Sequence, residues 1–343
     1  MDRLSEQQWR DFDENGFVRL GQLLEPESIV EFARRADELA SGTLVNPQIQ
    51  LQLDTGGDYD ALPGVVSQLT EGTRLYRKVQ GLEHDELFLP LVRHPVFEGI
   101  CARLYGPHAP VSLFRAMIMN KPAGQGTYLP WHQDGGDVWA LDRDPLVTVW
   151  VALDPATRAN GCLEVIPGSH RLGLLSERGS TLSTEDAERH CPADRVLSLE
   201  LEAGHGLLLH NWLLHRSGIN PSSQPRRAFT ACYLDGRTRG VLTGNHFPVI
   251  FGRLDPAPHH YVRQLHVDLA ALRHAHGTAE HYAHDLEAEV ERLRAKLGEA
   301  ESYARSLEQE RAARLLQDST VPLQASAAPR RGWLARLRGD GAH

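Results

Sequence analysis

Four residues of this sequence combine the side chains of a metal site with one that binds acids. His132 and Asp134 are separated by one residue, His215 follows much later, and Arg226 comes soon after His215. Two imidazoles and one carboxylate can occupy one face of Fe(II) and leave the opposite positions for a co-substrate and oxygen, as in non-haem iron oxygenases. In a strand, His132 and Asp134 would point to one face while Gln133 points away. The pattern predicts an iron site, and the guanidinium of Arg226 is suited to anchor an acidic co-substrate.

Other histidines and another metal are alternatives to this iron site. His266 and Asp268 form a second His-x-Asp pair, but their region has a helical pattern and leads into no later strand pair, so we exclude them as metal ligands. Zn²⁺ at the first site would favour a metal-dependent hydrolase, an alternative that leaves Arg226 without a role. The remaining histidines of the C-terminal region are expected on an exposed helix surface: His259, His260, His274, His276, His281 and His284.

A hairpin is expected to bring the arginine close to the second histidine. The apolar segment 206–214 is typical of a strand that ends at His215, and residues 216–225 are rich in turn-forming Gly, Asn, Pro and Ser. Segment 226–234 is then expected to return as the antiparallel partner. This arrangement would place Arg226 and His215 on adjacent strands.

The central part of the chain predicts a mainly β fold. Many short strands separated by turns favour a sandwich or jelly roll over alternating βαβ units. We expect a jelly-roll core at about residues 111–235, with helices packed outside it. The apolar segments that support this prediction are 111–119, 127–133, 146–153, 162–166, 196–201, 206–214 and 226–234.

Three helices are expected before this core. Ser5 and Gln8 have the spacing of a capping box, which predicts a helix start. Pro26 suits the first turn of a second helix, and a third is expected from about Pro95 to Leu104. Residues 43–66 are rich in Gly, Pro, Asp and Gln, and we expect a long irregular segment there.

The composition changes after residue 255, which we take as the end of a first domain, 1–255. We expect a linker at 256–277, a coiled coil at 278–316 and a disordered tail at 317–343. The heptad pattern predicts a homo-oligomer, and a single helix packed on the β-domain is the alternative. The apolar residues of this pattern alternate at spacings of three and four: Ala283, Leu286, Val290, Leu293, Leu297, Ala300, Ala304 and Leu307.

Composition narrows the class of protein further. A formal net charge of −9 argues against a nucleic-acid binder. The first residues lack the order of a signal peptide, and no apolar run is long enough to span a bilayer. Four widely separated cysteines are expected as reduced thiols, which favours a cytoplasmic protein. The basic stretch 330–338 is either a solvated terminus or a weak contact with an anionic membrane surface.

Four segments in this order resemble the phytanoyl-CoA dioxygenase family of Fe(II)/2-oxoglutarate oxygenases. They are Asn120-Lys-Pro122, Trp131-His-Gln-Asp134, Gly161-Cys-Leu-Glu-Val-Ile-Pro-Gly-Ser-His170 and His215-Arg-Ser-Gly-Ile-Asn220, the last followed by Pro225-Arg-Arg-Ala228. The resemblance covers residues 1 to about 250. It implies a double-stranded β-helix (a jelly-roll, cupin-like fold) and hydroxylation of a small organic substrate, with 2-oxoglutarate and O₂ consumed and succinate and CO₂ released.

The resemblance also assigns roles to single residues. It implies that Fe(II) is bound by His132, Asp134 and His215, that 2-oxoglutarate is bound by Arg226 with Ser217 beside it, and that Asn120 and Trp139 contribute a further co-substrate contact and a pocket wall. Related halogenases replace the carboxylate with a small residue, so the aspartate argues against halogenation. A catalytically idle scaffold that oligomerises through its coiled coil is the remaining alternative. The sequence does not identify the substrate.

Overall fold

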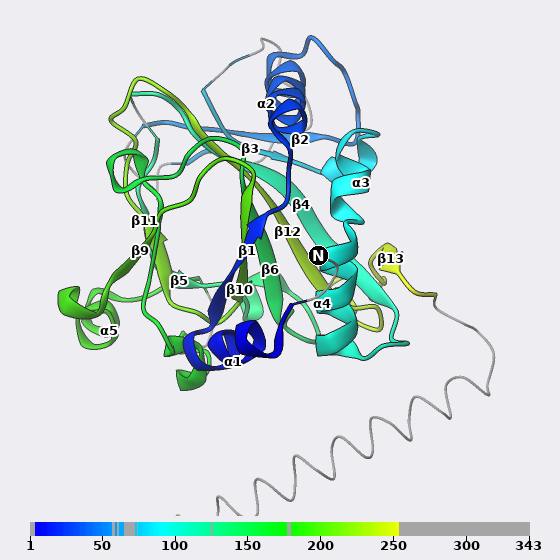
Figure 1. The fold of residues 1–343 in the computed structure, drawn as a ribbon, viewed down its shortest axis with the longest axis vertical. Coiled ribbons are helices and arrows are strands. Elements are labelled where there is room, and N and C mark those ends of the chain that lie inside the picture. Colours follow the sequence, from blue (N-terminus) through cyan, green and yellow to red (C-terminus); the bar gives the residue numbers. More distant parts are fainter. Residues whose placement is uncertain are drawn as a thin grey trace, which may run out of the picture. The chain divides into compact units, whose positions relative to one another are not determined.

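Two antiparallel β-sheets face each other at the centre of the protein. The computed structural model describes residues 4–56, 59, 62–64, 73, 75–124, 126–176 and 180–253. The larger sheet has the strand order β1-β10-β6-β12-β4-β3-β2, with β13 also paired to β4, and the smaller sheet has the order β8-β5-β11-β7-β9. In Figure 1, α3 and α4 lie beside β4 and β12 of the large sheet, whereas α5 lies near the small sheet on the other side.

The elements follow the chain in a regular order. The helices are α1 (Glu6–Asn15), α2 (Pro26–Ser41), α3 (Phe88–Val92), α4 (Pro95–Tyr105) and α5 (Thr184–His190). The large sheet contains β1 (Phe17–Gln22), β2 (Gln50–Leu53), β3 (Tyr76–Gln80), β4 (Val111–Lys121), β6 (Val147–Ala152), β10 (His205–His210), β12 (Arg226–Asp235) and β13 (Val249–Phe251). The small sheet contains β5 (Leu129–Gln133), β7 (Leu163–Val165), β8 (Ser180–Thr181), β9 (Leu197–Leu199) and β11 (His215–Ser217).

Alternating side chains divide the apolar core into two layers. Val149 and Val151 of β6, like Phe229 of β12, join the large cluster that the helices cover. Trp150 of β6 and Ala228 of β12 join a second cluster with residues of the small sheet. Successive residues of a strand point to opposite faces, so one sheet serves both layers. The site described below lies between the sheets, where the second layer leaves room.

The N-terminal helices form where the sequence predicts them. The Ser5 hydroxyl accepts a hydrogen bond from the Gln8 backbone, and the Gln8 side chain accepts one from the Ser5 backbone, so the capping box is present. Gly16 ends α1 with a left-handed φ of 78°. Pro26 occupies the first turn of α2. Buried faces of these helices cover the large sheet, which confirms the predicted mainly β core with flanking helices.

The predicted hairpin between segments 206–214 and 226–234 is wrong. The first segment divides: β10 ends at His210, the chain turns, and β11 joins the other sheet at His215. The turn is fixed locally, because the backbone N–H of Trp212 donates to His210 Nδ1 and that of Leu213 to His210 O. β12 pairs instead with β4 and β6.

Other predictions were incomplete or concern the C-terminal region. The segment 43–66 was expected to be irregular but contains β2. The strand β3 and the helices α3 and α5 were also not predicted from the sequence. The predicted linker, coiled coil and tail, and the second His-x-Asp pair, lie outside the described residues. Among the described residues, no helix has the length and apolar character needed to cross a membrane.

Candidate active site

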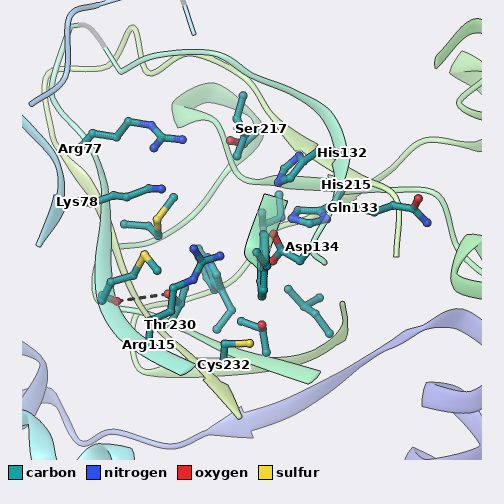
Figure 2. Close-up of a pocket in the computed structure, with 18 of the residues that line it drawn as sticks. Arg77, Lys78, Arg115, His132, Gln133, Asp134, His215, Ser217, Thr230 and Cys232 are labelled. Atoms are coloured by element: carbon teal, nitrogen blue, oxygen red, sulfur yellow. Dashed lines mark hydrogen bonds between the residues drawn. The ribbon is translucent and has the colours of Figure 1, made fainter. Parts of the chain in front are cut away.

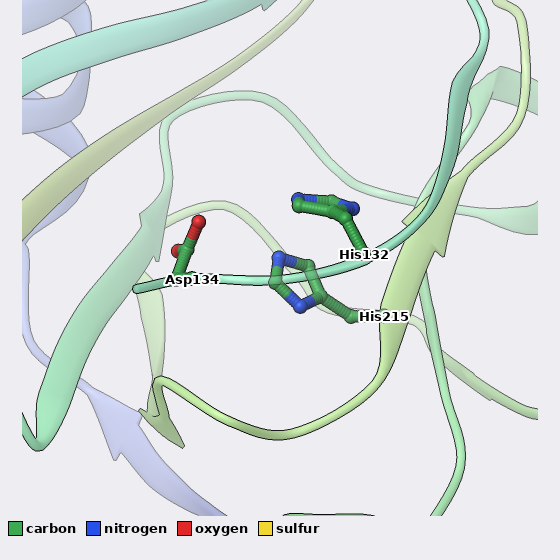
Figure 3. Close-up of side chains that lie close together, drawn as sticks. All are labelled: His132, Asp134 and His215. Carbon is green, nitrogen blue, oxygen red and sulfur yellow. The ribbon is translucent and has the colours of Figure 1, made fainter. Parts of the chain in front are cut away.

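The three predicted metal ligands come together at two paired strands. His132 of β5 and His215 of β11 are direct partners in the antiparallel register. One potential ligand atom from each of His132, Asp134 and His215 lies within 4.8 Å of the others, and Figure 3 shows the three side chains close together. Asp134 follows the end of β5, and its N–H donates to Asn211 O at 2.7 Å. Within the described part of the chain, no other group of His, Cys, Asp and Glu residues has this geometry.

Backbone carbonyls orient both imidazoles. His132 Nδ1 lies 2.8 Å from Pro130 O, and His215 Nδ1 lies 2.9 Å from Leu213 O. Because a carbonyl oxygen can only accept, each Nδ1 carries the hydrogen and each Nε2 keeps its lone pair. Hydrogen bonds of this kind hold metal-binding histidines in the correct tautomer. Both rings therefore offer Nε2 as a ligand atom.

The electrostatic environment favours the protonation states that a metal needs. Burial, reinforced by the neighbouring His215, lowers the pKa of His132 to about 3, so the imidazole is neutral near pH 7. Burial alone would raise the pKa of Asp134, but His215, His132 and two nearby cations lower it overall, so the carboxylate is charged. The neutral imidazole of His132 and the charged carboxylate of Asp134 suit Fe(II), and His215 adds a second imidazole to the donor set.

These ligands line a cavity of about 360 Å³ between the two sheets. Its walls include side chains from β4, β6, β10 and β12 of the large sheet and from β5, β7 and β11 of the small sheet. The apolar part of the lining includes Met117, Met119, Trp150, Leu163 and Leu209. A cavity of this size is at the small end of the range for ligand sites, about 300–1,000 Å³.

Arg226 reaches this cavity from the first position of β12. The residue is 3% exposed. Its Nη2 donates to Gly161 O at 3.1 Å, and its guanidinium lies 5.8 Å from the ring centre of Trp150. Its buried Nε has no hydrogen-bond partner among the described residues. Burial lowers the pKa of Arg226 to about 10, so the group remains a cation at neutral pH. A buried cation with an unused N–H fits a bound carboxylate.

Ser217 and Trp139 also line the cavity. Ser217 ends β11 and is 2% exposed. The ring of Trp139 stacks on Phe114 with centroids 4.8 Å apart, and the guanidinium of Arg115 lies 4.2 Å from its centroid. The structure therefore brings five residues to one cavity, with Trp139 in its wall: His132, Asp134, His215, Ser217 and Arg226.

Asn120 does not join them. Met117 and Met119 of β4 line the cavity, and Asn120, the next residue, projects from the opposite face of the sheet. Its Nδ2 donates to Tyr76 O at 2.8 Å. Gln133 is held as expected, because its Nε2 donates to the Gly173 and Trp212 carbonyls. Asn120 therefore ties β3 to β4 and lies outside the cavity lining, and its expected co-substrate contact stays a prediction.

Three cations of the cavity were not predicted. Arg77 and Lys78 lie in β3, and Arg115 lies in β4. The β3 pair was missed because the strand itself was not recognised. Arg115 could have been recognised from the sequence, because it is the one charged residue within the apolar segment 111–119. A charge in the middle of a predicted core strand indicates a site, because burial of an uncompensated charge is costly.

Comparison with known proteins assigns the family. The model of the phytanoyl-CoA dioxygenase (PhyH) family matches residues 12–228. The chain belongs to the phytanoyl-CoA dioxygenase family. A probable phytanoyl-CoA dioxygenase of Caenorhabditis elegans is 24% identical over 240 residues, which cover 67% of this chain and 75% of that protein. L-proline trans-4-hydroxylase of Streptomyces griseoviridis is 29% identical over 217 residues, which cover 56% of this chain and 79% of that protein.

Solved structures of low sequence identity share this fold. The epimerase SnoN, in complex with Fe³⁺, alpha ketoglutarate and a nogalamycin compound, has a TM-score of 0.53 at 19% identity, covering 74% of this chain and 90% of that one. EctD from S. alaskensis has a TM-score of 0.53 at 20% identity, covering 74% of this chain and 85% of that one. These likenesses show a shared fold. As a phytanoyl-CoA dioxygenase family member, the chain is an Fe(II)/2-oxoglutarate-dependent oxygenase that uses O₂.

Proposed function

We propose that this family member hydroxylates a small organic substrate, with decarboxylation of 2-oxoglutarate to succinate and CO₂. The observation that carries the proposal is the convergence of His132, Asp134 and His215 within 4.8 Å, on a cavity that Arg226 also lines. A binding protein or a hydrolase would need the three ligands but not the buried cation beside them. The oxygenase reaction needs both.

In this proposal, His132 and His215 bind Fe(II) through Nε2 and Asp134 binds through its carboxylate. When bound, Fe(II) and 2-oxoglutarate supply the oxidising chemistry that transfers one oxygen atom of O₂ to the substrate. The chain's own contribution is orientation. The Pro130 and Leu213 carbonyls hold the two imidazoles in one tautomer and one direction. Fixed ligands reduce the reorganisation that metal binding requires.

Arg226 anchors the distal carboxylate of 2-oxoglutarate, and Ser217 donates a further hydrogen bond to it. The guanidinium is held from behind by Gly161 O and by the face of Trp150, which leaves Nε for the co-substrate. The apolar walls contributed by Trp150, Leu163 and Leu209 limit the access of water to this charge pair. In a site shielded from water, such a pair is stronger than on the surface.

Hydroxylation of a small compound agrees with one relative. L-proline trans-4-hydroxylase of Streptomyces griseoviridis shares 29% identity with this chain over 217 residues. The cavity volume of about 360 Å³ supports a substrate that is itself small or that inserts only its reacting part.

The test begins with anaerobic protein and Fe(II). Addition of 2-oxoglutarate should produce the weak visible charge-transfer band of the iron chelate, and admission of O₂ should then release succinate. His132→Ala and Asp134→Ala should each abolish the band because each removes a ligand.

His170→Ala provides the matched control. This histidine lies in a family-like segment, but its Nε2 contacts Asp13 O and it does not line the cavity. The variant should keep the band. A band of full intensity in both His132→Ala and Asp134→Ala would disprove the ligand assignment.

A further inference from the structure

Three cations face the candidate metal ligands across the cavity. Arg77 and Lys78 of β3 and Arg115 of β4 line it. Figure 2 shows their side chains entering from the side opposite His132 and Asp134. Arg115 and Lys78 help to keep Asp134 ionised, but the proposed chemistry makes none of the three a contact of Fe(II) or 2-oxoglutarate. A cluster of this charge in a confined space requires an explanation.

The two arginines are held by neutral groups. Arg115 lies over the rings of Trp139 and Phe114, at 4.2 and 5.2 Å from their centroids. Arg77 is 6% exposed, donates from Nη1 to Gln52 Oε1 at 2.8 Å and lies 5.5 Å from the ring centre of Tyr59. These contacts fix the guanidinium groups in position without neutralising them. Each therefore keeps N–H donors and a full charge for another partner.

Shielded arginines elsewhere in the described structure have carboxylate partners. Arg227, with a side chain 13% exposed, pairs with Asp154 and Asp37 at 2.8 and 3.0 Å. Arg35 pairs with Asp85 at 2.9 Å. In the described part of the chain, no carboxylate lies within 4.0 Å of a side-chain nitrogen of Arg77, Lys78 or Arg115. Buried charges are normally paired, so an uncompensated cluster indicates a missing anion.

The co-substrate does not supply that anion. The inference rests on the proposed function, in which Fe(II) and Arg226 carry three positive charges. Asp134 and the two carboxylates of 2-oxoglutarate carry three negative charges, so this part of the cavity is already neutral. In the described part of the chain, Arg77 and Arg115 still lack a carboxylate within 4.0 Å, and Asp54 acts on Arg77 only from a longer distance. Burial, with Arg77 and Arg115 nearby, lowers the pKa of Lys78 to about 7, so it contributes a third charge only in part.

We propose that the substrate is a small organic anion whose carboxylate or phosphate group binds to Arg77 and Arg115. Both groups offer planar or tripodal oxygens that a guanidinium binds through paired hydrogen bonds. An acid anchored on β3 and β4 would direct the rest of the substrate across the cavity toward the metal ligands. The small volume that remains beside 2-oxoglutarate keeps the distance between the acidic group and the reacting carbon short. Arg77 and Arg115 thereby become specificity-determining residues.

The experiment compares acids with neutral compounds that keep the rest of the molecule. Protein loaded anaerobically with Fe(II) and one equivalent of 2-oxoglutarate is titrated with acetate against acetamide, phenylacetate against phenylacetamide, and phenyl phosphate against phenol. Calorimetry measures binding, and the visible band reports any change at the metal. We expect at least one acid to bind about tenfold more tightly than its neutral counterpart, as a charge-assisted hydrogen bond allows. The pair that discriminates best identifies the carboxylate or the phosphate as the preferred group.

Two variants and one control complete the test. Arg115→Gln and Arg77→Gln should each remove most of the preference for the acid. Arg103→Gln should keep it, because Arg103 also lies over an aromatic ring, that of Trp9, but outside the cavity. Equal binding of acids and neutral compounds, or a preference that survives both variants, would overturn the inference. Absence of the band on loading would instead contradict the proposed function, and calorimetry still measures the acid preference in that case.

Discussion

Replacement of Arg226 by methionine separates a binding role from a structural one. Methionine keeps the length and the packing against Trp150 but removes the charge and the donors. If the pair with 2-oxoglutarate is desolvated, its loss should weaken co-substrate binding by roughly 2–5 kcal/mol. That range corresponds to about 30- to 4,000-fold in the dissociation constant. Fe(II) binding should persist because the three ligands are intact.

The stability of the 2-oxoglutarate-free protein should change much less. Burial lowers the pKa of Arg226 from its ordinary value to about 10, which corresponds to about 3 kcal/mol of cost for its charged form. Removal of this cost is offset by loss of the hydrogen bond to Gly161 O and by the unpaired carbonyl that remains, about 1–3 kcal/mol. The two effects oppose each other, so we expect a change in the free energy of unfolding below about 2 kcal/mol.

Arg227→Met is the matched control on the neighbouring position of the same strand. Arg227 points to the other face of β12, where Asp154 and Asp37 pair with it. Breaking this ion pair should destabilise the protein by up to about 3–5 kcal/mol, while the affinity for 2-oxoglutarate stays constant. Anaerobic titration of 2-oxoglutarate and thermal unfolding measure the two quantities. Equal co-substrate affinity in wild type and Arg226→Met would refute the assignment of the anchor.

Three further predictions concern pH, a backbone contact and assembly. In the metal-free protein, folding lowers the pKa of His132 from 6.5 to about 3. Between these values the unfolded state binds a proton that the folded state does not, so the free energy of unfolding should fall as the pH drops from about 6.5 to about 3. His132→Gln should reduce this pH dependence in thermal unfolding. Gly161→Ala should weaken 2-oxoglutarate binding in the same titration, since at φ 79° the new Cβ would meet Gly218 O at 2.6 Å and displace the carbonyl that holds Arg226; unchanged affinity would contradict this. A truncation after residue 258 should be monomeric in light scattering and should still release succinate. The full chain should associate through residues 278–316, and a full chain that stays monomeric at high micromolar concentration would contradict the heptad prediction.

The three residues of the candidate metal site could be predicted because residue type and local sequence identify each of them. His132 and Asp134 are adjacent in one strand region, and the histidine that completes the group ends a long apolar segment. Chemistry selects these residue types, and strand alternation orients them. The path between the strands was not predictable in this way. Segment 206–214 is apolar both before and after its turn. Its pattern therefore does not indicate that the chain leaves one sheet at His210 and enters the other at His215.

The anion-binding side of the cavity shows why some site residues require the three-dimensional structure. Arg115 interrupts an apolar strand, and that strand pairs with β3, which carries Arg77 and Lys78. No short-range pattern connects residues 77 and 115, because only the register between β3 and β4 brings them to one cavity. The physical signal is the absence of a partner: among the described residues, the shielded arginines that stabilise the fold have carboxylates, and the cavity arginines have aromatic rings and an amide. A cation fixed in position yet left without a counter-charge stabilises the protein only when a ligand supplies that charge. The charge that the fold leaves uncompensated therefore predicts the charge of the substrate.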